Sequence, residues 1–177
     1  LQLWEQHAFI GKFNELMNKH DQNTLHDYWK NLPRKLKQRE SITFAYCQVL
    51  AKNNISAPLE TLLLPTLKKQ PSESFLKQLR NLPIKNADTL IAAVQHHLHK
   101  NATEAKWLSC LGHLAAMSEQ WSMAEKAFGS LTRQEGQLYD QQDLQIFADV
   151  LIQQQHYQAA TEVLLQLHNL KAAELDK

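Results

Sequence analysis

The chain has 177 residues, 44% of them hydrophobic, which is enough to bury one sizeable core and excludes disorder of the whole chain. Its 19 basic and 18 acidic side chains give a formal net charge of +1, so no long-range field would gather nucleic acid or anionic lipid. Gly occurs only 4 times and Pro 5 times, a composition that favours an all-α fold.

The two cysteines, Cys47 and Cys110, lie far apart in apolar-periodic stretches without a CxxC companion, so we expect buried, reduced thiols. No apolar run approaches the roughly 18 residues that a membrane span needs. No signal-peptide pattern opens the chain either. The chain begins with Leu1 rather than Met, which suggests a segment of a longer protein.

Apolar residues recur at intervals of three and four almost throughout, without convincing alternation of period two, so every predicted element is a helix. Pro33 suits a first helical turn, Ser56 and Thr103 are expected N-caps, and Gly136 marks a flexible break. In chain order we expect helices over about 3–20, 24–31, 33–53 and 57–69, a short helix between Pro71 and Pro83, a helix from Asn86 or Asp88 to about 100, and helices over about 104–118, 121–133, 140–154 and 157–170.

The last 70 or so residues align with themselves at an offset of 36 without a gap, small residues on small and large on large. Such self-similarity indicates a stack of repeated helix pairs. The offset places Leu111-Gly112 on Phe147-Ala148, Trp121 on Tyr157, Ala124 on Ala160, Phe128 on Leu164 and Leu131 on Leu167.

This pattern resembles the tetratricopeptide repeat, in which a large and a small residue in the first helix precede an Ala in the second. Leu111, Gly112, Trp121, Ala124 and Phe128 occupy those family positions. Because Gly112 and Ala124 lack bulk, they would let two antiparallel helices approach closely. The family period is about 34, so an offset of 36 implies a slightly longer connection around Gly136.

A weaker copy lies upstream, where Phe44-Ala45 precede Ala57 at the same spacing. Asn54 and Thr61 stand there in place of large residues, so the helix pair is better supported than its register. The resemblance implies a tetratricopeptide-like superhelical stack in one continuous solenoid. Residues 1–100 would hold degenerate repeats and an N-terminal cap, and residues 101–177 two repeats and a C-terminal helix.

Three stretches look like the C-terminal region of the HemY family, bacterial inner-membrane proteins associated with late haem (protoporphyrin) biosynthesis. They are residues 28–35 (YWKNLPRK), 45–53 and 107–121, and the likeness covers roughly residues 24–170. The resemblance implies a parent with N-terminal membrane helices that this chain lacks. It implies a soluble region here, on the cytoplasmic face, with haem-pathway enzymes as candidate partners.

His96, His97 and His99 form the densest cluster of metal-capable side chains, and positions 96 and 99 share a helix face. A third ligand is missing there, with no Cys, Asp or Glu within a turn, so a solvated helix end is favoured over a metal site. For His113, partner contact or solvation is favoured over haem ligation, because haem also needs a deep apolar pocket. We therefore expect no metal and no cofactor.

Neither GxSxG, HExxH, a phosphate-cradling glycine loop nor a Ser-His-Asp grouping is evident, so we do not expect an enzyme. A basic run could touch anionic headgroups in a membrane-anchored parent, but a solvated helix face is favoured. That run comprises Lys30, Arg34, Lys35, Lys37 and Arg39.

The predicted function is a protein-interaction scaffold whose first helices line a groove for a peptide or helix. The alternative, from another class, is a tetrapyrrole or haem carrier using the same groove, against which the polar Gln142, Gln145 and Gln153 count. The tetratricopeptide positions fall on Lys106, Ser109, His113, Ala116 and Met117, then on Gln142, Gln145, Asp149, Ile152 and Gln153, and in the weaker copy on Arg39, Ile42, Tyr46, Val49 and Leu50.

Overall fold

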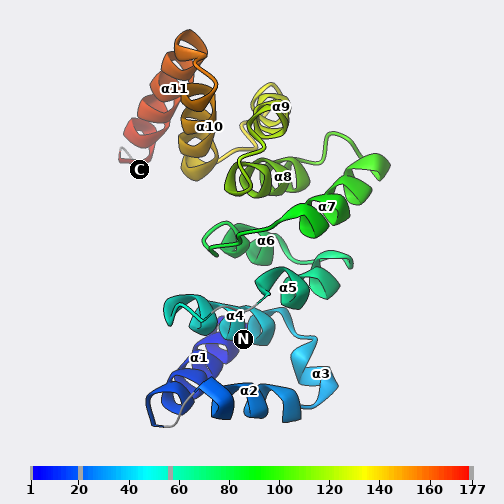
Figure 1. The fold of residues 1–177 in the computed structure, drawn as a ribbon. Coiled ribbons are helices and arrows are strands. Elements are labelled where there is room, and N and C mark those ends of the chain that lie inside the picture. Colours follow the sequence, from blue (N-terminus) through cyan, green and yellow to red (C-terminus); the bar gives the residue numbers. More distant parts are fainter. Residues whose placement is uncertain (1, 20–21, 56–57, 176–177) are drawn as a thin grey trace. The chain divides into compact units, whose positions relative to one another are not determined.

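The computed structural model describes residues 2–19, 22–55 and 58–175, and this part of the chain holds eleven helices and no strand (Figure 1). The chain divides into two compact units, Leu1–Pro83 and Ile84–Lys177. The all-α prediction is therefore confirmed. The expected domains, 1–100 and 101–177, stay a prediction.

The helices of the first unit are α1 (Gln2–Lys19), α2 (Gln22–Asn31), α3 (Arg34–Lys37), α4 (Glu40–Lys52), α5 (Leu59–Leu67) and α6 (Glu73–Leu79). Those of the second are α7 (Asp88–Lys100), α8 (Ala105–Met117), α9 (Trp121–Thr132), α10 (Gln141–Gln153) and α11 (Tyr157–Leu175).

The expected single helix over 33–53 is wrong, because the chain breaks between α3 and α4. Arg39 is extended, with φ −79° and ψ 129°, and serves as the N-cap of α4. The Thr43 hydroxyl donates to the Lys37 carbonyl oxygen at 2.8 Å, which satisfies an acceptor left open at the end of α3. Side chains from elsewhere in the unit hold the α4 side of the break, since Arg39 pairs with Glu5 and the Glu40 carboxylate accepts from Ser72.

Helix ends differ from expectation in two further places. Thr103 is not the N-cap of α8; that position belongs to Glu104, whose side chain makes no capping bond, while Thr103 is hydrogen-bonded to Asn101. The other expected cap, Ser56, lies outside the described residues, as does Ala57. Helix α11 runs to Leu175, beyond the predicted end at 170.

The core of the first unit is aromatic and joins α1, α2 and α4. Phe13 is fully buried and meets Tyr28, Trp29 and Tyr46 edge to face, with ring centroids 5.5 to 6.3 Å apart. Trp29 and Tyr46 stack in parallel at 4.1 Å. Such contacts add to the area that the rings bury, so this cluster fixes α4 against the two preceding helices.

The second unit contains two helical hairpins, α8/α9 and α10/α11, each a pair of antiparallel neighbours (Figure 1). Helices α8 and α10 begin and end 36 residues apart, and so do the first residues of α9 and α11. The small residues lie where the helices meet, since Ala124 and Ala160 are 0% and 2% exposed. The 36-residue repeat of the sequence is thus also a repeat of helix boundaries.

Helix α10 packs against both α8 and α9, so the second hairpin closes over the first. The rings of Phe128 on α9 and Phe147 on α10 stack at 5.7 Å. Leu131 and Leu144 are buried with them in one cluster. Around Phe128 of α9, the contact between hairpins is therefore apolar.

Candidate functional site

On the side of α8, the contact between hairpins is a buried polar network centred on Asp143 of α10. Its Oδ1 accepts a hydrogen bond from the Ser109 hydroxyl at 2.6 Å and lies 3.0 Å from Nε2 of His113. Its Oδ2 accepts from the Asp140 backbone N–H at 2.9 Å, and Asp140 Oδ1 accepts in turn from the Asp143 N–H. The second pair of bonds is a capping box that begins α10.

Ser, His and Asp side chains thus meet in space, although the sequence shows no such motif. Their hydrogen bonds run in a different order from those of a hydrolase triad. The Ser109 hydroxyl donates to the carboxylate rather than to the imidazole, so His113 is not placed to take its proton. All three side chains are buried, at 2% to 5% exposure, which leaves no approach for a substrate. The arrangement is suited to joining α8 to α10.

Six of the predicted groove residues are buried, so the expectation that they line an exposed surface is wrong for Ser109, His113, Tyr46, Ile42, Val49 and Leu50. For Ser109 and His113 the reason is that Asp143 of the next hairpin covers them. Tyr46 lies in the aromatic core, where burial raises the pKa of its hydroxyl to about 12. Ile42, Val49 and Leu50, carried over with Tyr46, are also buried, because α1 packs on α4.

The other predicted groove residues reach the surface. Gln145, Asp149, Ile152 and Gln153 on α10 are exposed, and the Gln145 amide lies 3.4 Å from the Asp149 carboxylate. Half-buried positions are Lys106, Ala116, Met117 and Gln142. The Lys106 ammonium pairs with Glu104 at 2.9 Å and lies 5.7 Å from the centre of the Trp107 ring. That these surface residues bind a partner stays a prediction.

Asp143 is the member of this site that the sequence patterns did not single out. A signal was present, because the offset of 36 places Asp143 on Trp107, and both positions are 2% exposed. A charged residue at a core position of a repeat needs a buried partner. The same offset places Ser109 on Gln145 and His113 on Asp149.

In the first unit, Arg39 is exposed and engages Glu5 of α1 rather than standing free. The Ser41 hydroxyl donates to the same carboxylate at 2.6 Å. This hydrogen bond lowers the pKa of Glu5 below its ordinary value; burial opposes the shift, and the hydrogen bond and charge of Arg39 add to it. The predicted groove residue of this copy is therefore part of a contact between α1 and α4.

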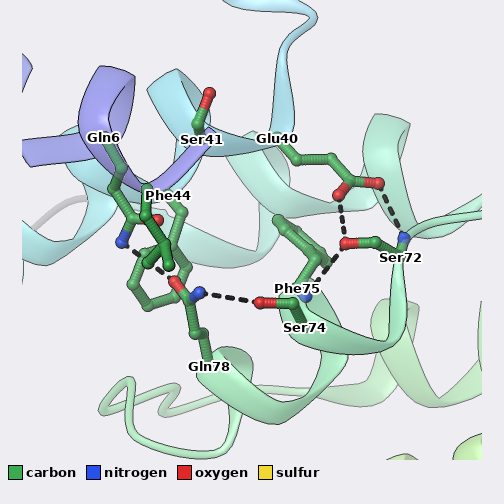
Figure 2. A pocket seen from close by; sticks show the side chains of 9 residues that line it. Gln6, Glu40, Ser41, Phe44, Ser72, Ser74, Phe75 and Gln78 are labelled. Atoms are coloured by element: carbon green, nitrogen blue, oxygen red, sulfur yellow. Dashed lines mark hydrogen bonds between the residues drawn. The ribbon is translucent and has the colours of Figure 1, made fainter. Parts of the chain in front are cut away.

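A cavity of about 370 Å³ lies between α1, α4 and α6, and Figure 2 shows how its polar side chains satisfy one another. Glu40 accepts from the Ser72 backbone and hydroxyl at 2.8 and 2.5 Å. The Gln78 amide accepts from Gln6 at 2.9 Å and donates to Ser74. These bonds join helices, and the Ser72 hydroxyl that donates to Glu40 also accepts from the Phe75 backbone N–H as the N-cap of α6. The polar groups of the cavity therefore have structural partners within the first unit.

A wider cavity of about 680 Å³ in the second unit lies between α7, α8 and α9. Its apolar lining includes Leu108, Leu111, Trp121 and Met123, with Lys126 at its edge. Trp121 is only half-buried here. The cavity is a surface hollow without a convergent polar set, and it adds an apolar face that the sequence patterns did not indicate.

Among residues 2–19, 22–55 and 58–175, no three His, Cys, Asp or Glu side chains gather as a metal site would require. His97 lies flat on the Trp107 ring at 4.0 Å, so it serves packing between α7 and α8, while His96 and His99 are exposed. Both cysteines are buried and reduced, as predicted. None of the described helices is long and apolar enough to cross a bilayer.

Comparison with curated proteins finds Protein HemY of Escherichia coli (strain K12), 22% identical over 136 residues, or 77% of this chain. Protein HemY of Shigella flexneri matches to the same extent. The chain spans about a third (34%) of the length of these relatives. No family model matches the chain, and no solved structure does. The likeness read from the sequence is thereby confirmed: the chain is similar to HemY, consistent with a C-terminal region of that family.

Proposed function

We propose that this chain is a tetratricopeptide-like stack of antiparallel helix pairs that holds a protein partner. The setting, taken from the HemY resemblance, is late haem biosynthesis at the bacterial inner membrane, with this region on the cytoplasmic face. The partner is a protein of that pathway. Neither nucleic acid nor a cofactor has a part in the proposal.

The observation that carries the proposal is the repetition of the helical hairpin in the second unit. They repeat at 36 residues, and the interior of each is filled by small residues against large ones, as in tetratricopeptide pairs. An array of this kind presents side chains of its first helices for recognition. On α10 these are Gln145, Asp149, Ile152 and Gln153, all exposed.

A binding role is also supported by the chemistry of the polar groups. The Ser109, His113 and Asp143 network is buried and satisfied within the protein, and its hydroxyl donates to the carboxylate. Polar residues on the surface of α10 offer hydrogen bonds and one negative charge, which suit a peptide or helix with a few apolar anchors. We therefore propose that the chain is not an enzyme.

The competing role, a haem carrier, needs a histidine that is accessible to ligate haem, and His113 is not accessible. Nε2 of His113 is 3.0 Å from Asp143 and its side chain is 2% exposed, so haem ligation would require breaking a contact between hairpins. Titration of haem into the chain should give no saturable one-to-one shift of the Soret band. A tight shift that His113→Ala removes would favour the carrier role instead.

The direct test is affinity capture on the immobilised chain of purified enzymes of the late haem pathway, each offered separately. The variant pair Lys106→Ala and Gln153→Ala should weaken capture several-fold, because both side chains reach the surface of first helices. Glu60→Ala, in the first unit, is the control and should leave capture unchanged. Failure of every such enzyme to bind would contradict the haem-pathway setting.

A further inference from the structure

The contact between the two hairpins of the second unit shows which positions of one hairpin pack against the first helix of the next. Helix α8 offers Ser109 and His113 to Asp143 of α10, and α9 offers Phe128 to Phe147 of α10. Both contacts come from one face of the incoming helix, because residues four apart lie on the same side.

A further contact continues along α9. Both Glu125 carboxylate oxygens are engaged after α10 ends, one by the Gln154 amide and the other by Nδ1 of His156 at 3.2 Å. The face of the first hairpin that receives the second, here called the receiving face, thus has two parts. Ser109 and His113 form a polar edge on α8, and Glu125 and Phe128 form a stripe along α9.

Shifted by the offset of 36, the same positions mark a receiving face on the second hairpin. Ser109 and His113 correspond to Gln145 and Asp149 on α10, and Phe128 corresponds to Leu164 on α11. Phe128 is 0% exposed, whereas Leu164 is 40% exposed. We call the face the α11 stripe with its α10 edge; it comprises Gln145, Asp149, Tyr157, Thr161, Leu164 and His168, all exposed.

The polar edge of this face has the opposite chemistry from that of the first hairpin. There, α8 supplies a hydroxyl and an imidazole, and the incoming helix supplies the carboxylate of Asp143. Here α10 itself supplies the carboxylate, Asp149, beside the Gln145 amide. A second carboxylate arriving at this place would be repelled, while a basic side chain would be paired as the contact loses water.

From this correspondence we infer that the α11 stripe with its α10 edge docks a partner helix carrying Lys or Arg at one position and a large apolar residue four positions later. The basic side chain meets Asp149, as Asp143 meets His113. The apolar side chain meets Leu164, as Phe147 meets Phe128. The inference deepens the proposed scaffold function, on which it rests, by giving the chemistry of the partner.

The probe is a fluorescent peptide of residues 140–155, the helix that fills the equivalent place on the first hairpin. Short helices are marginal in water, so a lactam joins position 145, as Gln145→Lys, to Asp149 on the side facing away. Two forms are compared, one with Asp143 and one with Asp143→Arg. Anisotropy against the full chain should show the Arg form binding at least about tenfold more tightly, since the pair is desolvated on docking.

Charge reversal in the chain supplies the decisive comparison. Asp149→Arg should reverse the preference between the two peptides, and Leu164→Glu should abolish binding of both. The matched control is Glu162→Arg, which makes the same charge change at an exposed position of α11 outside the stripe and should keep the original preference. Thermal melts confirm that each variant is folded.

The inference is overturned if the chain does not discriminate between the peptides, or if Asp149→Arg and Glu162→Arg behave alike. It is also overturned if the chain forms a concentration-dependent dimer that Leu164→Glu abolishes, because the face would then receive a second copy. Its failure is distinct from failure of the proposed function, whose test changes Lys106 and Gln153 and reads capture of pathway enzymes.

Discussion

At the scale of the residue, the chemistry of this protein is concentrated in buried polar contacts between helices. Asp143 accepts hydrogen bonds from Ser109, His113 and the Asp140 backbone at 2.6 to 3.0 Å. A carboxylate that is buried away from solvent is tolerated only when hydrogen-bond donors of this kind surround it. The network therefore specifies how α10 meets α8, and its members are constrained together.

Asp143→Ala should lower the free energy of unfolding by about 3 kcal/mol, because it leaves the buried Ser109 and His113 without their acceptor. Urea denaturation measures the change. Lys106→Ala on α8, the helix that carries Ser109 and His113, is the control, and as a surface change it should stay within about 0.5 kcal/mol. Equal effects of the two substitutions would contradict the structural role of the network.

Glu5 should make stability depend on pH at the acidic end. Its pKa is lowered in the folded chain by the Ser41 hydroxyl and then by Arg39, so its contribution is present above the unfolded pKa and is lost as the pH falls through the folded pKa. Glu5→Gln should therefore cost up to about 1 kcal/mol at pH 7 and progressively less below about pH 4.5.

Denaturation at a series of pH values measures this difference. Glu162→Gln, which removes an exposed carboxylate on α11, supplies the baseline. A cost for Glu5→Gln that stays constant down to pH 2 would show that the carboxylate charge is not responsible.

At the scale of the element, the α8/α9 hairpin depends on one missing side chain. A Cβ at Gly112 would lie 2.7 Å from ring carbons of Phe128, which is fully buried and held by Phe147. In the second hairpin the corresponding residues are Ala148 and Leu164, so the sequence has a methyl group and an aliphatic side chain where the first hairpin has a hydrogen atom and a ring.

Gly112→Ala should destabilise the protein by about 1 to 3 kcal/mol, because neither the ring nor the helix can move without cost. Gly129→Ala on α9 is the matched control: its Cβ would meet nothing closer than the Arg133 guanidinium at 3.9 Å. There the loss of backbone freedom in the unfolded chain should stabilise by roughly 0.5 to 1 kcal/mol. Thermal denaturation of the two variants should show shifts of opposite sign.

At the scale of the whole molecule, each of the two units carries one buried thiol, Cys47 in the first and Cys110 in the second. Burial raises the pKa of Cys47 to about 12, so at pH 8 this thiol is almost entirely protonated. Cys110 is 2% exposed. The thiols therefore report on opening of the unit that contains them.

The folded chain should show no reaction with Ellman's reagent at pH 8, and both thiols should react in 6 M guanidinium, because access and ionisation are gained only on unfolding. Single substitutions Cys47→Ala and Cys110→Ala assign the signal to each unit. A thiol titrated rapidly in native buffer would contradict the packing around that cysteine.

Local physics was enough for the sequence by itself to determine the helical class, most helix boundaries and the 36-residue repeat. Periodicity of three and four, and the matching of small with large residues, act within one helix or hairpin. The likeness to HemY was also readable from short stretches around Trp29 and Trp107.

Only the tertiary structure decided which polar residues are available to a partner. Ser109 and His113 have the pattern of surface positions on an isolated helix, but Asp143, on another hairpin, covers them. The break before α4 likewise depends on Glu5 and Ser72, each more than 30 positions away. Burial and helix ends of this kind are set by neighbours distant in sequence, because the free energy of a polar group depends on whether another element desolvates and satisfies it.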